Sequence, residues 1–139
     1  LYLFNLIGDP LLRLPQSEKV QISAPGILKP GETISISGKS SVQGRAKVEL
    51  IVRRDRLKFS APQRKEFEPS ESFLQSLREI YEKSNNPTLA TADVTPKSDG
   101  SFDCELTVPA DATGPCHVRV FVEGKDASGI GHCDVMVAP

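Results

Sequence analysis

The feature that most constrains the fold is a two-residue alternation of apolar and polar side chains, which recurs along the chain. The clearest run covers residues 46–53, where Lys47, Glu49 and Arg53 occupy the polar positions. The apolar positions of this run are Ala46, Val48, Leu50 and Val52. Such alternation predicts a strand with one buried face. Because proline and glycine fall mostly between runs of this kind, the sequence predicts an all-β domain of short strands joined by turns.

Seven strands are expected between Lys19 and Val137. They fall within residues 19–23, 33–37, 46–53, 89–94, 101–108, 116–122 and 132–137. Seven strands suffice for a two-layer sandwich around one core. We therefore expect residues 16–139 to form a β-sandwich, and residues 1–15 to be the tail and linker of a different domain.

One segment, near residues 70–85, has the period of a helix instead. Its apolar positions are Phe73, Leu74, Leu77, Ile80 and Tyr81, which form one stripe on an α-helix. Ser72 with Gln75 can form a capping box, Ser70 is a competing N-cap, and Asn85-Asn86-Pro87 predicts the stop. A helix is thus expected between the third and fourth strands, packed over an open flank of the sheet, with a long loop at 54–67 leading into it.

Turn and strand motifs resemble those of bacterial immunoglobulin-like modules. They are Lys-Pro-Gly-Glu-Thr-Ile-Ser-Ile-Ser-Gly at 29–38, Asp-Gly-Ser-Phe at 99–102, and Val108-Pro109 followed by Cys-His-Val-Arg-Val at 116–120. The resemblance implies an immunoglobulin-like β-sandwich.

Residues 2–14 resemble the closing stretch of the gingipain-type cysteine peptidase domain, where Gly-Asp-Pro and apolar residues precede an immunoglobulin-like domain. The catalytic His and Cys of that family lie upstream of this motif, so no catalytic role passes to any residue here. The resemblance implies a peptidase-like neighbour in the same polypeptide. We expect an exported protein, located in the periplasm, at the cell surface or outside the cell. Detached from that neighbour, the apolar segment 1–15 is expected to drive self-association.

The reactive side chains cluster in the last two predicted strands. If these strands pair about a turn at 123–126, Cys116 lies opposite Cys133 and His117 opposite His132. Because side chains alternate, both cysteines then share one face and both histidines the other, which excludes a single Cys2His2 zinc site. Two alternatives remain for the cysteines: a cross-strand disulfide, or two buried thiols. The histidines face solvent or a partner, or hold a weak two-ligand metal site.

Positive charge is concentrated in residues 45–65, where eight Lys or Arg oppose Glu49 and Asp55, although the whole chain carries −1. Only one aromatic residue, Phe59, lies in this stretch, which disfavours nucleic-acid binding. The stretch is either a solvated strand face with a basic loop, or a docking surface for an acidic partner. The candidate interaction residues are Arg53, Arg54, Arg56, Lys58, His117 and His132.

No motif of the chain indicates catalysis. The sequence lacks a calcium-loop pattern, a phosphate-binding loop and a nucleophile elbow, and adjacent Cys116 and His117 project to opposite sides of a strand. No apolar run approaches the roughly 20 residues of a membrane helix. We expect a non-catalytic accessory module without a cofactor. The alternative is an adhesion or ligand-binding module for glycan or protein, which a concave patch with exposed aromatics would distinguish.

Overall fold

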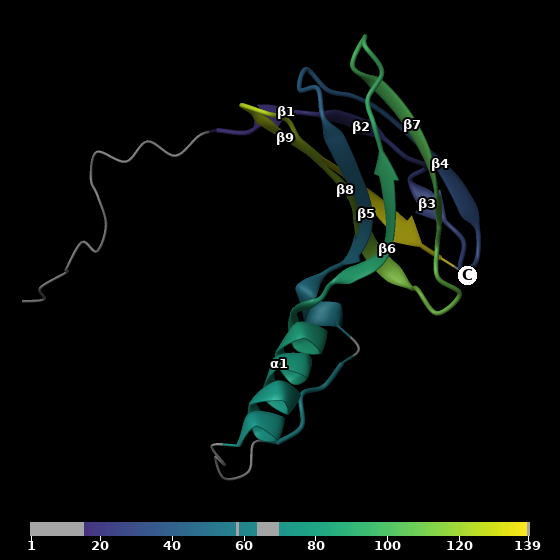
Figure 1. The fold of residues 1–139 in the computed structure, drawn as a ribbon. Coiled ribbons are helices and arrows are strands. Elements are labelled where there is room, and N and C mark those ends of the chain that lie inside the picture. The colour runs from purple at the N-terminus through teal and green to yellow at the C-terminus, as the bar shows by residue number, and fades with distance from the viewer. Residues whose placement is uncertain (1–15, 58, 64–69, 139) are drawn as a thin grey trace, which may run out of the picture.

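The structure is a computed structural model that describes residues 16–57, 59–63 and 70–138 (Figure 1). The strands are β1 Glu18–Lys19, β2 Gln21–Ser23, β3 Ile27–Leu28, β4 Thr33–Lys39, β5 Arg45–Val52, β6 Thr88–Val94, β7 Ser101–Thr107, β8 Gly114–Glu123 and β9 Ser128–Val137. A short 3-10 helix, η1, covers Arg54–Arg56, and the α-helix α1 covers Glu71–Asn85. The segment 1–15, with the self-association expected of it, lies outside the described residues.

Two sheets face each other. One is six-stranded in the order β1-β9-β8-β5-β6, with β3 also paired to β9, and the other is three-stranded in the order β2-β4-β7. The chain changes sheet at every step from β1 to β5, between β6 and β7, and again between β7 and β8. Figure 1 shows the curved layers enclosing one interior. This arrangement is an immunoglobulin-like β-sandwich, as the sequence predicts.

The apolar positions of the alternating runs fill the interior. Fully buried members include Ile36, Val48, Leu50, Phe102, Val118, Val120 and Val122. Branched aliphatic side chains suit a pleated surface, because they pack well against neighbours across the strands. The polar positions of the same runs in β5, β8 and β9 form the outer face of the six-stranded sheet, which we call the outer face.

The first predicted strand, 19–23, is divided in two. Val20 is buried, and its N–H donates to the Ile130 carbonyl at 2.9 Å. Before it, β1 pairs with β9 in one sheet; after it, β2 pairs with β4 in the other. The chain therefore crosses between the sheets at Val20, a change that an alternation pattern does not record. The short strand β3 is a further element that the sequence pattern does not predict.

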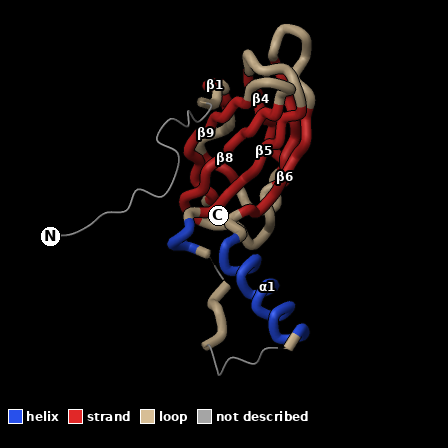
Figure 2. The backbone as a smooth tube through the Cα atoms, turned by 60° about the vertical axis from the view of Figure 1, so that its left-hand side comes forward, coloured by secondary structure: helices blue, strands red, loops and turns tan. Residues whose placement is uncertain are grey.

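The helix forms where the sequence predicts it, but its predicted packing is wrong. Ser70 is the N-cap, and its Oγ accepts a hydrogen bond from the Phe73 N–H at 3.3 Å. No residue of α1 is buried, and both views show the helix projecting from one end of the sandwich (Figures 1 and 2). The reason is that each sheet already covers the inner face of the other, so the core does not need the helix as a cover.

The predicted register of the last two strands is also wrong. Glu123 pairs with Ser128, so the turn contains residues 124–127, and the Gly124 N–H donates to the Ala127 carbonyl at 3.0 Å. This turn is displaced by one residue from the one expected at 123–126, which shifts every cross-strand partner by two positions. Cys116 consequently faces Val135, and Cys133 faces Val118. The predicted alternation of inward and outward side chains is retained, because a shift by two residues preserves each face.

Candidate functional site

A network of charges crosses the middle of the outer face. Arg119 on β8 donates from Nε to Glu49 Oε2 on β5 at 2.6 Å, and Lys47 Nζ lies 3.3 Å from Glu49 Oε1. The Glu49 side chain is only 12% exposed. Burial alone would raise the pKa of its carboxyl, but the hydrogen bonds and charges of Arg119 and Lys47 outweigh burial and hold that pKa below its ordinary value.

The two histidines lie on the outer face, as predicted, but not opposite each other. His117 faces Asp134, with His117 Nδ1 and Asp134 Oδ1 2.7 Å apart. His132 is exposed and faces Arg119 in the next row. The two histidines therefore do not face each other, and neither is paired with a second histidine that could bind a metal ion with it. Among the described residues, no group of three or more His, Cys, Asp or Glu side chains is arranged to hold a metal ion.

Beside this polar centre lies an exposed apolar pair, Phe121 and Ile130. The two residues are cross-strand neighbours on β8 and β9, with exposed fractions of 45% and 53%. A shallow hollow of about 260 Å³ adjoins Phe121, and charged residues border it. Those residues are Arg45, Lys47, Asp93 and Glu123. An apolar contact beside a hollow with both signs of charge is typical of a protein-binding surface.

The apolar pair lies at the corner where β1 joins the sheet. Lys19 of β1 pairs with Ile130 itself, and Ser17 Oγ shares a 2.8 Å hydrogen bond with Ser128 Oγ. The chain therefore passes beside Ile130 as it enters the sandwich. The opposite end of β9, at Val137, pairs with Gly114 at the end that carries α1.

Of the six residues predicted to form an interaction surface, the structure describes the side chains of four, Arg53, Arg56, His117 and His132. Arg53 is bound to Asp55 through two hydrogen bonds of 3.1 and 3.3 Å. Arg56 turns toward Gly114, where its Nη1 lies 3.0 Å from the position that a Cβ would take. The side chain of Arg54 and all of Lys58 lie outside the described part of the chain. Arg53 and Arg56 thus lie at the helix end of the sandwich, whereas His132 lies three rows further along the sheet from Val52.

All three cysteines are free thiols. Cys116 is buried in the core, and the observed register offsets it from Cys133 by two positions, so the cross-strand disulfide is not formed. Burial raises the pKa of the Cys104, Cys116 and Cys133 thiols. They are therefore protonated and weakly nucleophilic at neutral pH. Cys116 points inward and His117 outward, so this adjacent pair cannot share a proton.

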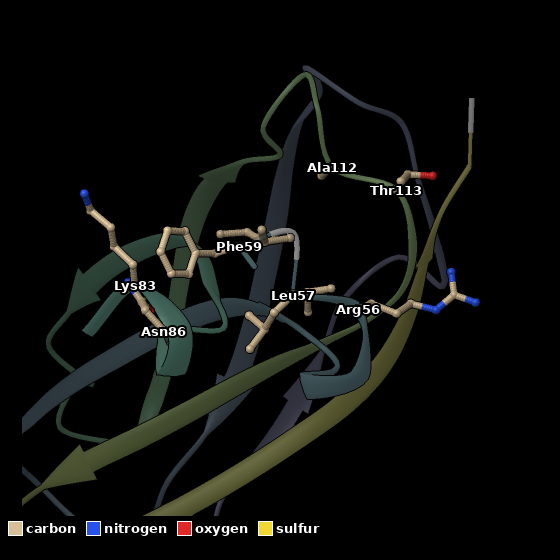
Figure 3. A pocket seen from close by; sticks show the side chains of 9 residues that line it. Arg56, Leu57, Phe59, Lys83, Asn86, Ala112 and Thr113 are labelled. Atoms are coloured by element: carbon tan, nitrogen blue, oxygen red, sulfur yellow. The ribbon is translucent and has the colours of Figure 1, made fainter. Parts of the chain in front are cut away.

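A cavity of about 330 Å³ lies where α1 joins the sandwich (Figure 3). Its walls come from the end of β5, the segment after η1, the end of α1, the start of β6 and the loop before β8. Apolar side chains predominate, namely Val52, Leu57, Phe59, Leu89 and Ala112. A wider hollow of about 660 Å³ follows the apolar stripe of α1 beside Pro62 and Gln63.

The sequence places Phe121 on the polar face of its strand, as one of the aromatics that could form a carbohydrate site with Tyr2 or Tyr81, but it does not predict the partner Ile130. In the run 116–122, Phe121 is an apolar residue at a position whose neighbours on the same face are His117 and Arg119. A large apolar side chain at a polar position of an alternating strand predicts an apolar residue that is exposed to solvent. The cavity carries no comparable signal, because its walls come from three stretches that are distant in sequence, 52–59, 83–89 and 112–113.

Comparison with known proteins supports the fold alone. No family model and no curated protein sequence matches the chain. The human F-spondin reeler domain superposes with a TM-score of 0.51 at 10% identity, covering 91% of this chain and 94% of that one. The native conformation of Escherichia coli alpha-2-macroglobulin gives 0.55 at 13% identity, covering 86% of this chain but only 10% of that one. These identities are too low to transfer an activity.

A third solved structure is less similar. The sulfur carrier protein SoxY from Chlorobium limicola f thiosulfatophilum gives a TM-score of 0.43 at 15% identity, covering 88% of this chain and 81% of that one. Within the described ranges, no helix is long and apolar enough to cross a membrane.

Proposed function

We propose that the chain is a non-catalytic accessory module of a larger, exported protein, and that it packs against the polypeptide preceding it. The contact surface is the corner of the outer face formed by Phe121, Ile130 and the hollow beside them. The observation that carries the proposal is the position of this apolar pair next to β1, where the preceding polypeptide reaches the sandwich.

Tethering favours this contact over one with a free partner. A domain joined to β1 by a short linker is held at millimolar effective concentration near Ile130, so even a small apolar contact is occupied. Burying the exposed parts of one Phe and one Ile contributes about 1–2 kcal/mol each. The charged residues around the hollow favour one orientation of the partner, because like charges placed next to each other at such a rim cost free energy.

The nature of the neighbour is inferred from the sequence. The motif at residues 2–14 resembles the end of a gingipain-type peptidase domain, so we propose a peptidase-like domain as the packing partner. The ends of the described chain support a spacing role as well. Because β1 joins the sheet at one end of β9 and β9 finishes at the other, the polypeptide enters and leaves the module at opposite ends.

The test uses the parent protein carrying Phe121→Ser and Ile130→Ser. Both side chains are already exposed, so the isolated chain should unfold at an unchanged temperature, whereas the parent should lose coupling between its domains and unfold in separate transitions. The control is Leu74→Ser with Tyr81→Ser, two exposed residues of α1. If the pair behaves like this control, the outer face is not the docking surface.

A second candidate function, ligand binding, is favoured by the cavity under α1. The exposed ring of Phe59 lines this concave site, which matches the feature expected of a binding module. Its apolar walls suit a glycan poorly, because buried sugar hydroxyls need hydrogen-bond partners.

A further inference from the structure

The cavity under α1 is built by the way the helical insertion leaves and rejoins the sheet. The chain departs after Val52 and returns at Thr88, and the Val52 N–H donates to the Pro87 carbonyl at 2.9 Å. This bond holds the two ends of the insertion together. Across from them, the Ala112 N–H donates to the Pro109 carbonyl at 3.0 Å and fixes the loop before β8.

The walls between these anchors are apolar and concave. Leu57 is half-buried, and Ala112 is buried. Phe59 and Leu89 complete the wall. The volume of about 330 Å³ is at the lower end of the range that holds small organic ligands. The occupant must therefore be small and must have an apolar body.

Two cations flank the apolar wall. In Figure 3, Leu57 and Phe59 lie between Arg56 and Lys83, which line the rim of the cavity and whose charged ends point outward from it. The ion pairs of the described residues use other cations, among them Arg53 with Asp55, so neither Arg56 nor Lys83 is neutralised by a described carboxylate. Cations at the rim of an apolar cavity favour an anionic ligand when no carboxylate within the described ranges pairs with them.

We propose that this cavity binds a small apolar carboxylic acid of the fatty or arylalkanoic class. The apolar body lies along Leu57, Phe59 and Leu89, and the carboxylate reaches Arg56 or Lys83. A guanidinium offers a carboxylate two parallel hydrogen bonds, which makes Arg56 the stronger of the two partners. The site is on a different surface from the docking corner, so its failure would leave the docking proposal intact.

The experiment is an NMR titration of the chain of residues 1–139 with sodium octanoate, and in parallel with 1-octanol, which has the same body without the charge. We expect saturable shifts at the amides of Leu57, Leu89 and Ala112, with octanoate bound about fivefold more tightly than octanol. Shifts that do not saturate, or that map to the outer face, would overturn the proposal.

Variants distinguish the contribution of the two cations to ligand affinity from that of the apolar wall. Arg56→Gln with Lys83→Gln should abolish the preference for octanoate while leaving the affinity for octanol unchanged. Phe59→Ser should weaken both ligands about tenfold. The matched control is Lys125→Gln, an exposed cation in the turn at the far end of the sandwich. A preference for octanoate that survives the double variant, or that disappears in the control, contradicts the assignment.

Discussion

Glu49 is the carboxylate on the outer face whose surroundings differ most from water. It is largely buried and is held by Arg119 and Lys47, which lower the pKa of its carboxyl in the folded state. A carboxylate with a lowered folded pKa stabilises the fold above its unfolded pKa, and this contribution is lost as pH falls through the folded value.

The first prediction rests on that linkage. Glu49→Gln should lower the free energy of unfolding at pH 7 by about 1 kcal/mol, because the half-exposed Arg119 loses a charge-assisted hydrogen bond. This difference in the free energy of unfolding should shrink as the pH falls below 4.5, the ordinary pKa of the carboxyl, and vanish at lower pH. Urea unfolding of the chain between pH 3 and 7 measures it. Glu105→Gln, at an exposed position of β7, is the control; a deficit independent of pH would refute the charge argument.

Three glycines form a graded series for a second prediction. Gly100 has φ of 81°, and a Cβ there would lie 2.1 Å from the Ser40 carbonyl oxygen. Gly31 has φ of 79° with no atom within 4 Å, and Gly26 has open space and no positive φ. Gly100→Ala should therefore lower the free energy of unfolding by more than about 2 kcal/mol. Gly31→Ala should lower it by about 1 kcal/mol, and Gly26→Ala should leave it almost unchanged.

Urea midpoints of the three alanine variants give the ranking directly. Equal losses in the free energy of unfolding for Gly31→Ala and Gly100→Ala would mean that the Ser40 carbonyl moves to make room for the new methyl group. That result would contradict the close packing described for Gly100.

At the scale of elements, α1 contrasts with the strands that carry it. The helix has no buried residue, whereas β5 and β8 are anchored by fully buried valines and leucine. Helices without tertiary packing are marginal in water. We expect α1 to open locally while the sandwich stays folded.

The third prediction tests this independence with hydrogen exchange. Ser70→Ala removes the N-cap bond to Phe73, which should speed exchange of α1 amides about fivefold and leave β8 amides unchanged. Ser76→Ala is the matched control, because Ser76 Oγ bonds back to the Phe73 carbonyl inside the helix, and alanine there should slow exchange slightly. Faster exchange in both α1 and β8 would show that the helix and the sandwich unfold as one unit.

The elements themselves were predictable to different degrees. Alternation in 46–53 and the helical stripe at 73–81 predict their elements correctly, because both signals are local. The crossing at Val20, the four-residue turn after Glu123 and the projection of α1 depend on contacts between distant segments. Of the candidate site, the outward position of His117 and His132 follows from alternation, but their partners Asp134 and Arg119 depend on the register.

At the scale of the molecule, the sandwich presents two distinct surfaces. The corner of Phe121 and Ile130 adjoins β1, and the cavity adjoins α1 at the other end of the strands. If both proposals hold, ligand binding in the cavity can affect the neighbouring domain only through the rigid sheet that separates the two sites. The two proposals are therefore tested separately.

The most direct test of the central claim, that the outer face contacts the preceding domain, is photo-crosslinking in the parent protein. Phe121 is replaced by benzoylphenylalanine, with the same replacement at exposed Leu74 as the control, and the adducts are mapped by mass spectrometry. The account predicts crosslinks within one molecule from position 121 to the polypeptide preceding residue 16, and none of these from position 74. Absence of such crosslinks at position 121, or equal yields at both positions, would contradict it.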